Sequence, residues 1–299
     1  MLTLQQKVID SFKLIQDEIC NALVEVTGQS FQEDVWDYHA GSGGGITRVL
    51  EGDIIEKGGV NFSSVEGGEL SEKIAGRLEG GNDRQFFATG VSLVLHPKNP
   101  FVPTVHMNVR YLEHGKKRWF GGGIDLTPYY PFEEDIIQFH KTLKETCDKH
   151  NAQYYPKFKK WCDEYFFIKH RNEPRGVGGI FFDYLTENLE QVFAFTCEVA
   201  RTFPKAYVPI LEKRNKMHYS REHREFQFLR RGRYVEFNLI YDRGTVFGLE
   251  TGGRTETVLI SLPPLAAWPY NFTPDPGSQE ARLFEILTPR NWAEQKTSG

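Results

Sequence analysis

The sequence lacks long apolar runs and contains few cysteines. No stretch of about 18 or more apolar residues occurs among its 299 residues, so no transmembrane helix is expected. The N-terminus has neither a basic region followed by an apolar stretch nor an arginine-rich presequence, which predicts no secretory or transit peptide. The four cysteines lie far apart and form no C-x-x-C pair, which disfavours a disulfide framework and a thiolate zinc site. We therefore expect a cytoplasmic protein with reduced thiols.

An excess of positive charge is also missing. Lys and Arg total 36 against 40 for Asp and Glu, a net charge of −4, which argues against a general nucleic-acid binder. One segment departs from this balance, because residues 212–233 hold eight basic and three acidic residues. Such a patch is consistent with a solvated face, a nucleic-acid footprint or an electrostatic funnel for a polyanionic small molecule.

Several short catalytic motifs are absent as well. The glycine-rich pieces at 41–45 and 120–123 match neither a P-loop nor G-x-G-x-x-G, and they favour close approach of the backbone to a ligand or another strand. There is no G-x-S-x-G elbow, which argues against a serine hydrolase. Nine histidines are present, but none lies in H-E-x-x-H and their spacing does not bring them together, so a metal site is not favoured.

The pattern of apolar residues predicts an α+β fold in a single domain spanning residues 1–299. An amphipathic helix is expected over residues 3–27, between a capping-box pair and Gly28. The later elements are expected as short strands and loops at 41–75, strands at 87–95, 104–111 and 118–120, helices at 132–150, 155–170 and 183–203, and strands at 234–241, 245–249 and 255–262. Short turns between the strands indicate antiparallel pairing in one large sheet, and the tail from about 288 to 299 is expected to fray.

The most informative strand is the one predicted at 104–111. Because alternate side chains of a strand share a face, Val105, Met107, Val109 and Tyr111 take one face, and His106, Asn108 and Arg110 take the other. A solvent-facing strand surface is one interpretation of the polar row. The alternative is a site for an acidic, hydrogen-bonding ligand, since an imidazole, an amide and a guanidinium suit such a ligand.

A second candidate lies at Asp242 and Arg243, which are expected at a strand end or turn. One interpretation is an Asx-type turn in which Asp242 bonds its own backbone. The other is a functional carboxylate and guanidinium pair.

Long, co-linear motifs across residues 40 to 275 carry a family resemblance. They read GGVNFS at 58–63, HMNVRY at 106–111, WFGGGIDLTP at 119–128, KHRNE at 169–173, YDRGT at 241–245, TGGRTE at 251–256 and SLPP at 261–264. In these motifs the chain resembles the oxygen-dependent coproporphyrinogen III oxidases. The resemblance implies oxidative decarboxylation of coproporphyrinogen III, in which two propionates become vinyls, O2 is consumed, and CO2 and H2O2 are released on the way to haem. It also implies a homodimer and a flat antiparallel sheet flanked by helices on both faces.

The resemblance further implies roles for individual residues. His106 matches the proton donor of the family, and Asp242, Arg243 and Asp125 are further catalytic candidates. The positions that match substrate contacts are Ser92, Asn108, Val109, Arg110, Gly252, Gly253 and Arg254. His170 and the strands expected at about 234–270 match the dimer interface. No organic cofactor is implied, and a divalent metal at His96, His106, His140 and His170 is possible but not favoured.

Two other classes of function stay open from the residues alone. A porphyrin- or haem-binding carrier would use the same aromatic cavity and the same arginines without needing His106 or Asp242 for turnover. An RNA-binding module would use residues 212–233 and would show a salt-dependent affinity for nucleic acid.

Overall fold

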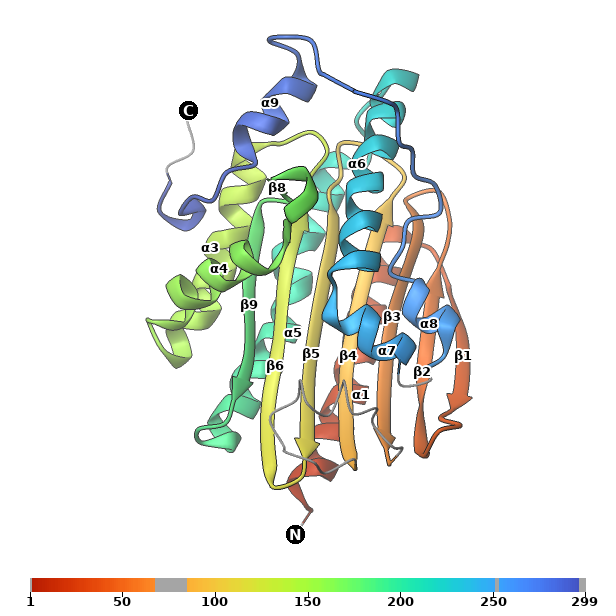
Figure 1. Ribbon diagram of the computed structural model, residues 1–299, viewed down its shortest axis with the longest axis vertical. Helices are drawn as coiled ribbons and strands as arrows, with labels where there is room; N and C mark the ends of the chain where they lie inside the picture. The colour runs from red at the N-terminus through yellow and green to blue at the C-terminus, as the bar shows by residue number, and fades with distance from the viewer. Residues whose placement is uncertain (1, 68–84, 251–252, 296–299) are drawn as a thin grey trace.

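A single antiparallel sheet forms the centre of the molecule (Figure 1). The computed structural model describes residues 2–67, 85–250 and 253–295. In these residues seven strands pair in the order β1-β2-β3-β4-β5-β6-β9, and each neighbouring pair is antiparallel. The strands are β1 (Phe31–Asp37), β2 (Ser42–Leu50), β3 (Ile55–Glu66), β4 (Phe86–Pro97), β5 (Thr104–His114), β6 (Lys117–Thr127) and β9 (Gly178–Leu185). The predicted α+β class and single domain are confirmed.

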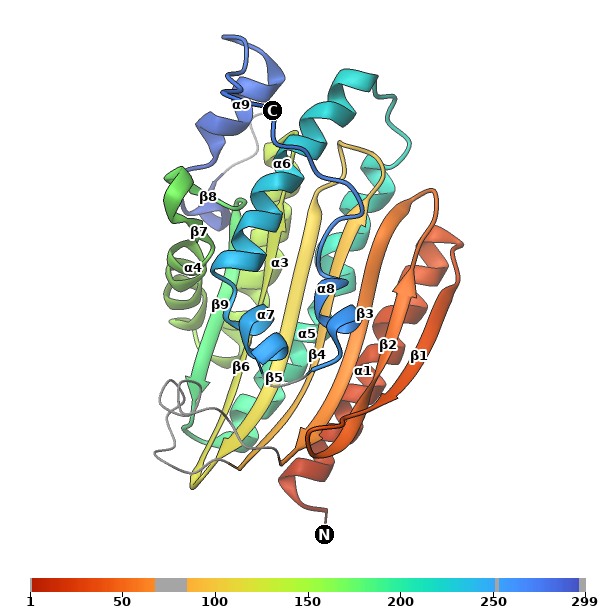
Figure 2. The same ribbon diagram turned by 45° about the vertical axis from the view of Figure 1, so that its right-hand side comes forward.

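Helices cover both faces of this sheet (Figures 1 and 2). The face behind the sheet in Figure 1 carries α1 (Leu4–Thr27), α3 (Glu133–His150) and α5 (Leu189–Arg214). The opposite face carries α6 (Arg221–Ile240), α7 (Arg243–Glu250) and α8 (Thr255–Leu259). The remaining elements are α4 (Tyr154–Tyr165), which packs on β9, β7 (Phe167–Ile168), η1 (Lys169–Arg171), β8 (Glu173–Pro174), α9 (Gln279–Ile286) and η2 (Trp292–Glu294).

The main core lies between the sheet and the first group of helices. The apolar face of β5 enters it, because Val105, Met107, Val109 and Tyr111 are fully buried there. The alternation predicted for this strand is therefore confirmed, and its polar residues face the other side of the sheet. Burial of such side chains contributes on the order of 1.5–3 kcal/mol each.

The N-terminal helix forms as predicted. The Thr3 side chain accepts a hydrogen bond from the Gln6 amide, and Gly28 ends the helix in a left-handed conformation with φ of 66°. A residue with a Cβ would be strained at that φ, so glycine suits the C-cap.

The strands predicted after residue 233 are wrong, because α6, α7 and α8 occupy this segment. In α6 the buried side chains include Tyr234, Phe237 and Asn238, which follow the three- and four-residue spacing of a helix. Strand alternation would have buried Leu239 or Ile240, and both are exposed. Aromatic and β-branched residues suggested strands, but they pack here as a helix against a sheet that is already complete without them.

Three further predictions need correction. The region predicted helical at 183–203 contains the end of β9, and α5 runs on to Arg214. Residues 42–66 form two long strands instead of short pieces, and the predicted segment from 68 onward lies outside the described residues. The tail predicted to fray from 288 contains Trp292, which is fully buried in the core, while residues 296–299 lie outside the described residues.

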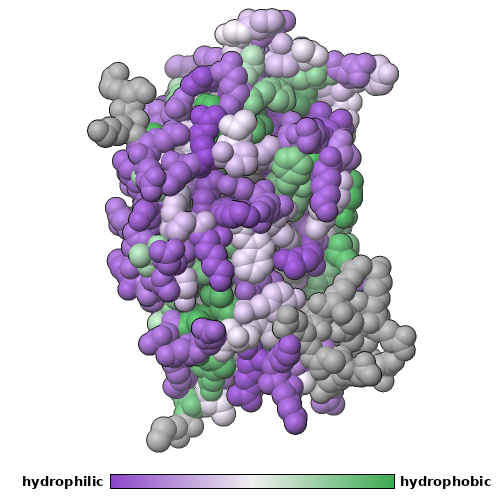
Figure 3. All heavy atoms as spheres, turned by 60° about the vertical axis from the view of Figure 1, so that its left-hand side comes forward, coloured by the Kyte–Doolittle hydropathy of each residue, from purple (hydrophilic) through white to green (hydrophobic). Residues whose placement is uncertain are grey.

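The exterior is polar on the side that carries α3 and α4. Figure 3 shows mainly hydrophilic residues there, with apolar residues in small separate groups. No helix in the described part of the chain has both the length and the apolar composition of a membrane span.

Candidate active site

The floor of the site is a set of cross-strand rows on the sheet face that carries α6, α7 and α8. One row pairs Asn61 of β3 with Ser92 of β4, Asn108 of β5 and Gly123 of β6. The next row pairs Ser63, Gly90, Arg110 and Gly121. Directly paired residues share a face and lie about 4.5–5.5 Å apart. The floor is therefore polar and nearly flat, because small residues alternate with the few long side chains.

His106 stands on the same face and is held by a carboxylate. Its Nδ1 lies 2.8 Å from Asp125 Oδ1, across the β5–β6 pair. A carboxylate only accepts, so Nδ1 carries the proton and donates it to Asp125. In the neutral imidazole this leaves Nε2 as the acceptor for a ligand proton, and His106 lines the pocket.

Asp125 is also bound by an arginine that the sequence analysis missed. Arg175 Nη2 donates to Asp125 Oδ2 at 2.7 Å, and both side chains are only 2% exposed. Burial alone would raise the pKa of Asp125, but Arg175 and His106 outweigh it and lower the pKa below its ordinary value. Both Asp125 oxygens are therefore occupied by His106 and Arg175, and Asp125 is not among the residues that line the pocket.

The Arg175 guanidinium is held by further contacts. Nη1 donates to Asn238 Oδ1 of α6 at 2.9 Å, and the guanidinium carbon lies 4.0 Å from the centre of the Phe166 ring. Arg175 follows the charged residues Lys169, Arg171 and Glu173, and nothing in this stretch distinguishes it as a pocket residue. Only the fold shows that it lines the pocket.

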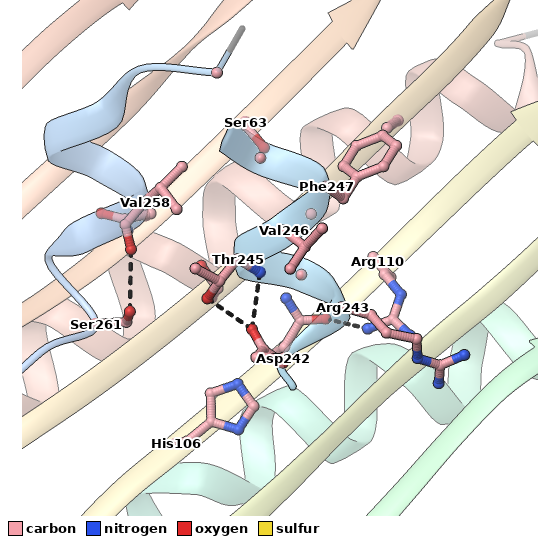
Figure 4. Close-up of a pocket in the computed structure, with 18 of the residues that line it drawn as sticks. Ser63, His106, Arg110, Asp242, Arg243, Thr245, Val246, Phe247, Val258 and Ser261 are labelled. Carbon is pink, nitrogen blue, oxygen red and sulfur yellow. Dashed lines mark hydrogen bonds between the residues drawn. The ribbon is translucent and has the colours of Figure 1, made fainter. Parts of the chain in front are cut away.

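A second cluster of charged side chains consists of Arg110, Arg243 and the carboxylate of Asp183 between them. Arg110 Nη2 lies 2.8 Å from Asp183 Oδ2, and Arg243 Nη2 lies 3.8 Å from the same oxygen. Arg110 also donates to Asn108 Oδ1 at 2.8 Å. Figure 4 shows Arg110 and Arg243 side by side where α7 meets the sheet. Asp183 was missed because it was assigned to the start of a helix, although an acid at the end of the apolar run 180–182 is unusual for a strand.

Asp242 makes local hydrogen bonds and also faces the pocket. Its Oδ2 accepts hydrogen bonds from the backbone amide and the hydroxyl of Thr245, each at 2.9 Å, so it caps α7. Its Oδ1 accepts from the Tyr165 hydroxyl at 2.9 Å, and the residue also lines the pocket. Asp is a common N-cap residue, and the sequence analysis interpreted this helix start as a strand end or turn.

The pocket between these elements has a volume of about 1070 Å³. That lies at the upper end of the ~300–1,000 Å³ typical of small-molecule sites, so a macrocycle fits the size class. Aromatic side chains contribute much of its apolar wall, among them Trp36, Tyr38, Trp119, Phe166, Phe181 and Phe247.

Only some of the other residues predicted to contact the substrate line the pocket. Ser92, Gly253 and Arg254 line the pocket. Arg254 binds Asp34 of β1 at 2.6 Å, so it already has a carboxylate partner in the protein. The Val109 side chain lies in the core on the opposite face of the sheet. Gly252 lies outside the described residues.

The four histidines considered as metal ligands do not come together. The His96 ring bonds Thr104 Oγ1 and Ser261 O, and the His140 ring bonds the Tyr155 hydroxyl and Val177 O. His170 instead bonds Tyr241 and Glu236 near the surface. Within residues 2–67, 85–250 and 253–295, no group of three or more His, Cys, Asp or Glu side chains is placed to hold a metal ion. These side chains therefore do not fit a four-histidine metal centre.

The basic segment 212–233 is not an open patch. Arg214, Arg230 and Arg231 are buried, and each is paired with acids from other parts of the chain. Their partners are Glu134 and Asp135, Glu173, and Glu56 respectively. The local charge is largely neutralised in the fold, which removes the main basis for a nucleic-acid footprint or a funnel.

The fold and the site together define an enzyme-like pocket for a large ligand that bears acidic groups. The sequence model described as coproporphyrinogen III oxidase matches residues 7–292. The chain is 48% identical over 300 residues to the oxygen-dependent coproporphyrinogen-III oxidase of Francisella tularensis subsp. holarctica, covering 96% of this chain and 97% of that protein. It is 53% identical over 257 residues to the protein of the same name from Francisella philomiragia, covering 84% and 83%. The chain belongs to the coproporphyrinogen III oxidase family.

Proposed function

We propose that this enzyme oxidatively decarboxylates two propionates of coproporphyrinogen III to vinyls, giving protoporphyrinogen IX for haem biosynthesis. The observation that carries the proposal is that the carboxylate-held His106 lies on the same face of β5 as Arg110, in a pocket of about 1070 Å³. It is supported by the family match over 7–292 and by relatives that carry the name of this activity.

Each half of the reaction removes CO2 from the outer carbon of a propionate and a hydrogen from the adjacent carbon, which is bound to the pyrrole ring. The electron pair of the broken C–CO2 bond becomes the vinyl double bond. The departing hydrogen transfers two electrons and one proton to O2, and one additional proton completes H2O2. His106 is placed to supply that proton from Nε2 in its imidazolium form, in which both ring nitrogens carry a proton and Nδ1 donates to Asp125.

The other pocket residues bind and orient the macrocycle. Arg110 and Arg243 are the cations placed to meet a propionate carboxylate, since a guanidinium matches a carboxylate in a bidentate geometry. We assign to Asp242 the carboxylate that stabilises a cationic pyrrole or accepts the proton of a pyrrole N–H while CO2 leaves. An electron-rich porphyrinogen can reduce O2 itself, so these residues need only position the ring and stabilise charge, without an organic cofactor.

We also propose a homodimer and a cytoplasmic location. The predicted interface segment is helical, and it exposes large apolar side chains from α6 to residue 272, namely Leu239, Ile240, Leu249, Leu265, Trp268, Tyr270 and Phe272. Several large exposed apolar side chains in one segment of the chain favour a protein contact. All four cysteines are free and buried, which suits a reducing compartment.

The decisive experiment is aerobic turnover of coproporphyrinogen III by chelator-treated protein, with the porphyrins separated by chromatography. Protoporphyrin without added metal supports the proposal. Product only after addition of a divalent ion would restore a metal requirement. Bound substrate with no product in either condition would instead indicate a carrier.

A further inference from the structure

Asp183 occupies an unusual place at the edge of the pocket. In the β6–β9 pair, Asp183 and Tyr184 together lie opposite the single residue Gly121, which makes a β-bulge. Tyr184 has a φ of 51°, in the left-handed region that a bulky residue adopts at a cost. Regular alternation places Asp183 on the pocket face, two residues after Phe181, and the extra residue Tyr184 lines the pocket as well.

The Asp183 carboxylate is held in place and shared by two cations. Its Oδ1 accepts from the Tyr184 amide at 3.0 Å, and its side chain is only 9% exposed. Its Oδ2 lies 2.8 Å from Arg110 Nη2 and 3.8 Å from Arg243 Nη2. The two guanidiniums come from β5 and α7, and without this shared oxygen they would repel each other.

The opposing glycine is part of the same arrangement. A Cβ on Gly121 would lie 2.5 Å from Asp183 Oδ1 and 2.9 Å from both Nε and Nη2 of Arg110. Only a residue without a side chain lets the carboxylate and the guanidinium meet at this point. The close contact of Asp183, Arg110 and Gly121 therefore depends on each of the three residues.

Aromatic rings also pack near the two guanidiniums. Arg110 lies 5.8 Å from the centre of the Phe181 ring, and Arg243 lies 5.0 Å from that of Tyr165. Phe181 and Tyr165 stack at 4.2 Å with their planes 7° apart. The two arginines share one anion and one aromatic stack, which leaves one net positive charge for an incoming carboxylate.

We propose that Asp183 is a positioning residue that holds Arg110 and Arg243 together as one carboxylate-binding pair for a propionate of the substrate. This inference rests on the proposed function. Asp183 need not touch the substrate, and it acts by fixing the separation and direction of the two guanidiniums. The geometry assigns this role to a shared anion, so the charge of Asp183 matters more than its volume.

The first test is Asp183→Asn, which keeps the shape and the acceptor for the Tyr184 amide. The variant raises the pocket charge by one, so attraction of the acidic substrate is preserved while the alignment of the arginines is lost. We expect kcat to fall at least about tenfold, because small displacements of a reacting group have effects of this size or larger. KM should change less than about threefold, and chromatography should show release of a porphyrin with three carboxylates, which marks a substrate that leaves after one decarboxylation.

The second test is Gly121→Ala, which disturbs the same contact without changing charge. It should reproduce the fall in kcat and the tricarboxylate product. The matched control is Glu56→Gln, because Glu56 is likewise shared by two arginines, Arg224 and Arg231, but lies outside the pocket. After correction for the folded fraction, its kcat and product pattern should equal those of the wild type.

The outcomes separate the two proposals. If the wild type produces no protoporphyrin, the proposed function fails. If the wild type turns over and folded Asp183→Asn has an unchanged kcat and product pattern, the positioning role is wrong. A rise in KM with an unchanged kcat would also overturn it, because that result describes loss of simple binding. If Gly121→Ala does not fold, Asp183→Asn still decides the question.

Discussion

Asp125→Asn is the substitution that tests the centre of the site most directly. Asp125 is shared by His106 and Arg175, and it is almost completely buried. Asparagine keeps the shape but has one acceptor oxygen and one donor group. Because Arg175 can only donate, it will bond to the asparagine Oδ1, and the asparagine NH2 will then face His106 Nδ1. That contact requires an unprotonated Nδ1, which moves the proton of the neutral ring to Nε2.

The expected loss of stability can be worked from the buried pair. Removing one partner of a buried ion pair costs about 3–5 kcal/mol, and we take about 3 because asparagine keeps one hydrogen bond. At about 2.1 cal/mol/K per residue, the 299 residues give an unfolding entropy of about 0.6 kcal/mol/K, so Tm should fall by about 5 °C. Loss of the carboxylate that stabilises the charged, proton-donating form of His106 should lower kcat at least about a hundredfold.

The assays are thermal unfolding at neutral pH and turnover of coproporphyrinogen III. The lowered pKa of Asp125 means that its contribution is complete above the ordinary carboxyl pKa of about 4 and is lost as the pH falls through the lower folded value. The difference in Tm from the wild type should therefore shrink in strong acid. In a cycle with Arg175→Met, the double variant should be less destabilised than the sum of the singles by at least about 2 kcal/mol. Additive single effects, or a kcat near that of the wild type, would refute the reasoning.

Three further predictions follow from other contacts. His106→Asn should abolish protoporphyrin formation while quenching of coproporphyrin fluorescence shows that binding persists, and loss of binding would contradict a proton-donor role. Burial alone would raise the pKa of Glu236, but hydrogen bonds from Arg171 and His170 lower it to about 2. Its stabilising effect should thus be lost as the pH falls from about 4.5 to about 2. When the free energy of unfolding is measured against pH, Glu236→Gln should lack this part of the decrease. Treatment with a chelator should leave wild-type turnover intact, and loss of activity restored by a divalent ion would show the expectation to be wrong.

The sequence predicted the elements whose residues follow a single clear period. The alternation at 104–111 placed the core face and the pocket face of β5 correctly, and α1 followed from its period and caps. The segment 234–241 permits two interpretations, because its aromatic and β-branched residues suit a strand and also bury Tyr234, Phe237 and Asn238 at helical spacing. The segment forms a helix because it packs on the face of the seven-stranded sheet, and a helix in that position buries only one stripe of its side chains.

The arrangement of charge shows why the site itself was only partly predicted. The basic residues that cluster in the sequence at 212–233 are dispersed in space and largely neutralised by acids. The arginines that line the pocket behave in the opposite way, because each comes from a different part of the chain. They are Arg110 of β5, Arg175 between β8 and β9, Arg243 of α7 and Arg254 before α8.

Each pocket arginine also has a carboxylate partner within the protein. Asp125 binds Arg175, Asp34 binds Arg254, and Asp183 alone serves both Arg110 and Arg243. A charge count along the sequence therefore cannot locate the carboxylate-binding group. It becomes visible only where two cations share one anion, and that place is the bulge of β9 opposite Gly121. A propionate bound there would complete the charge balance that the protein itself leaves open.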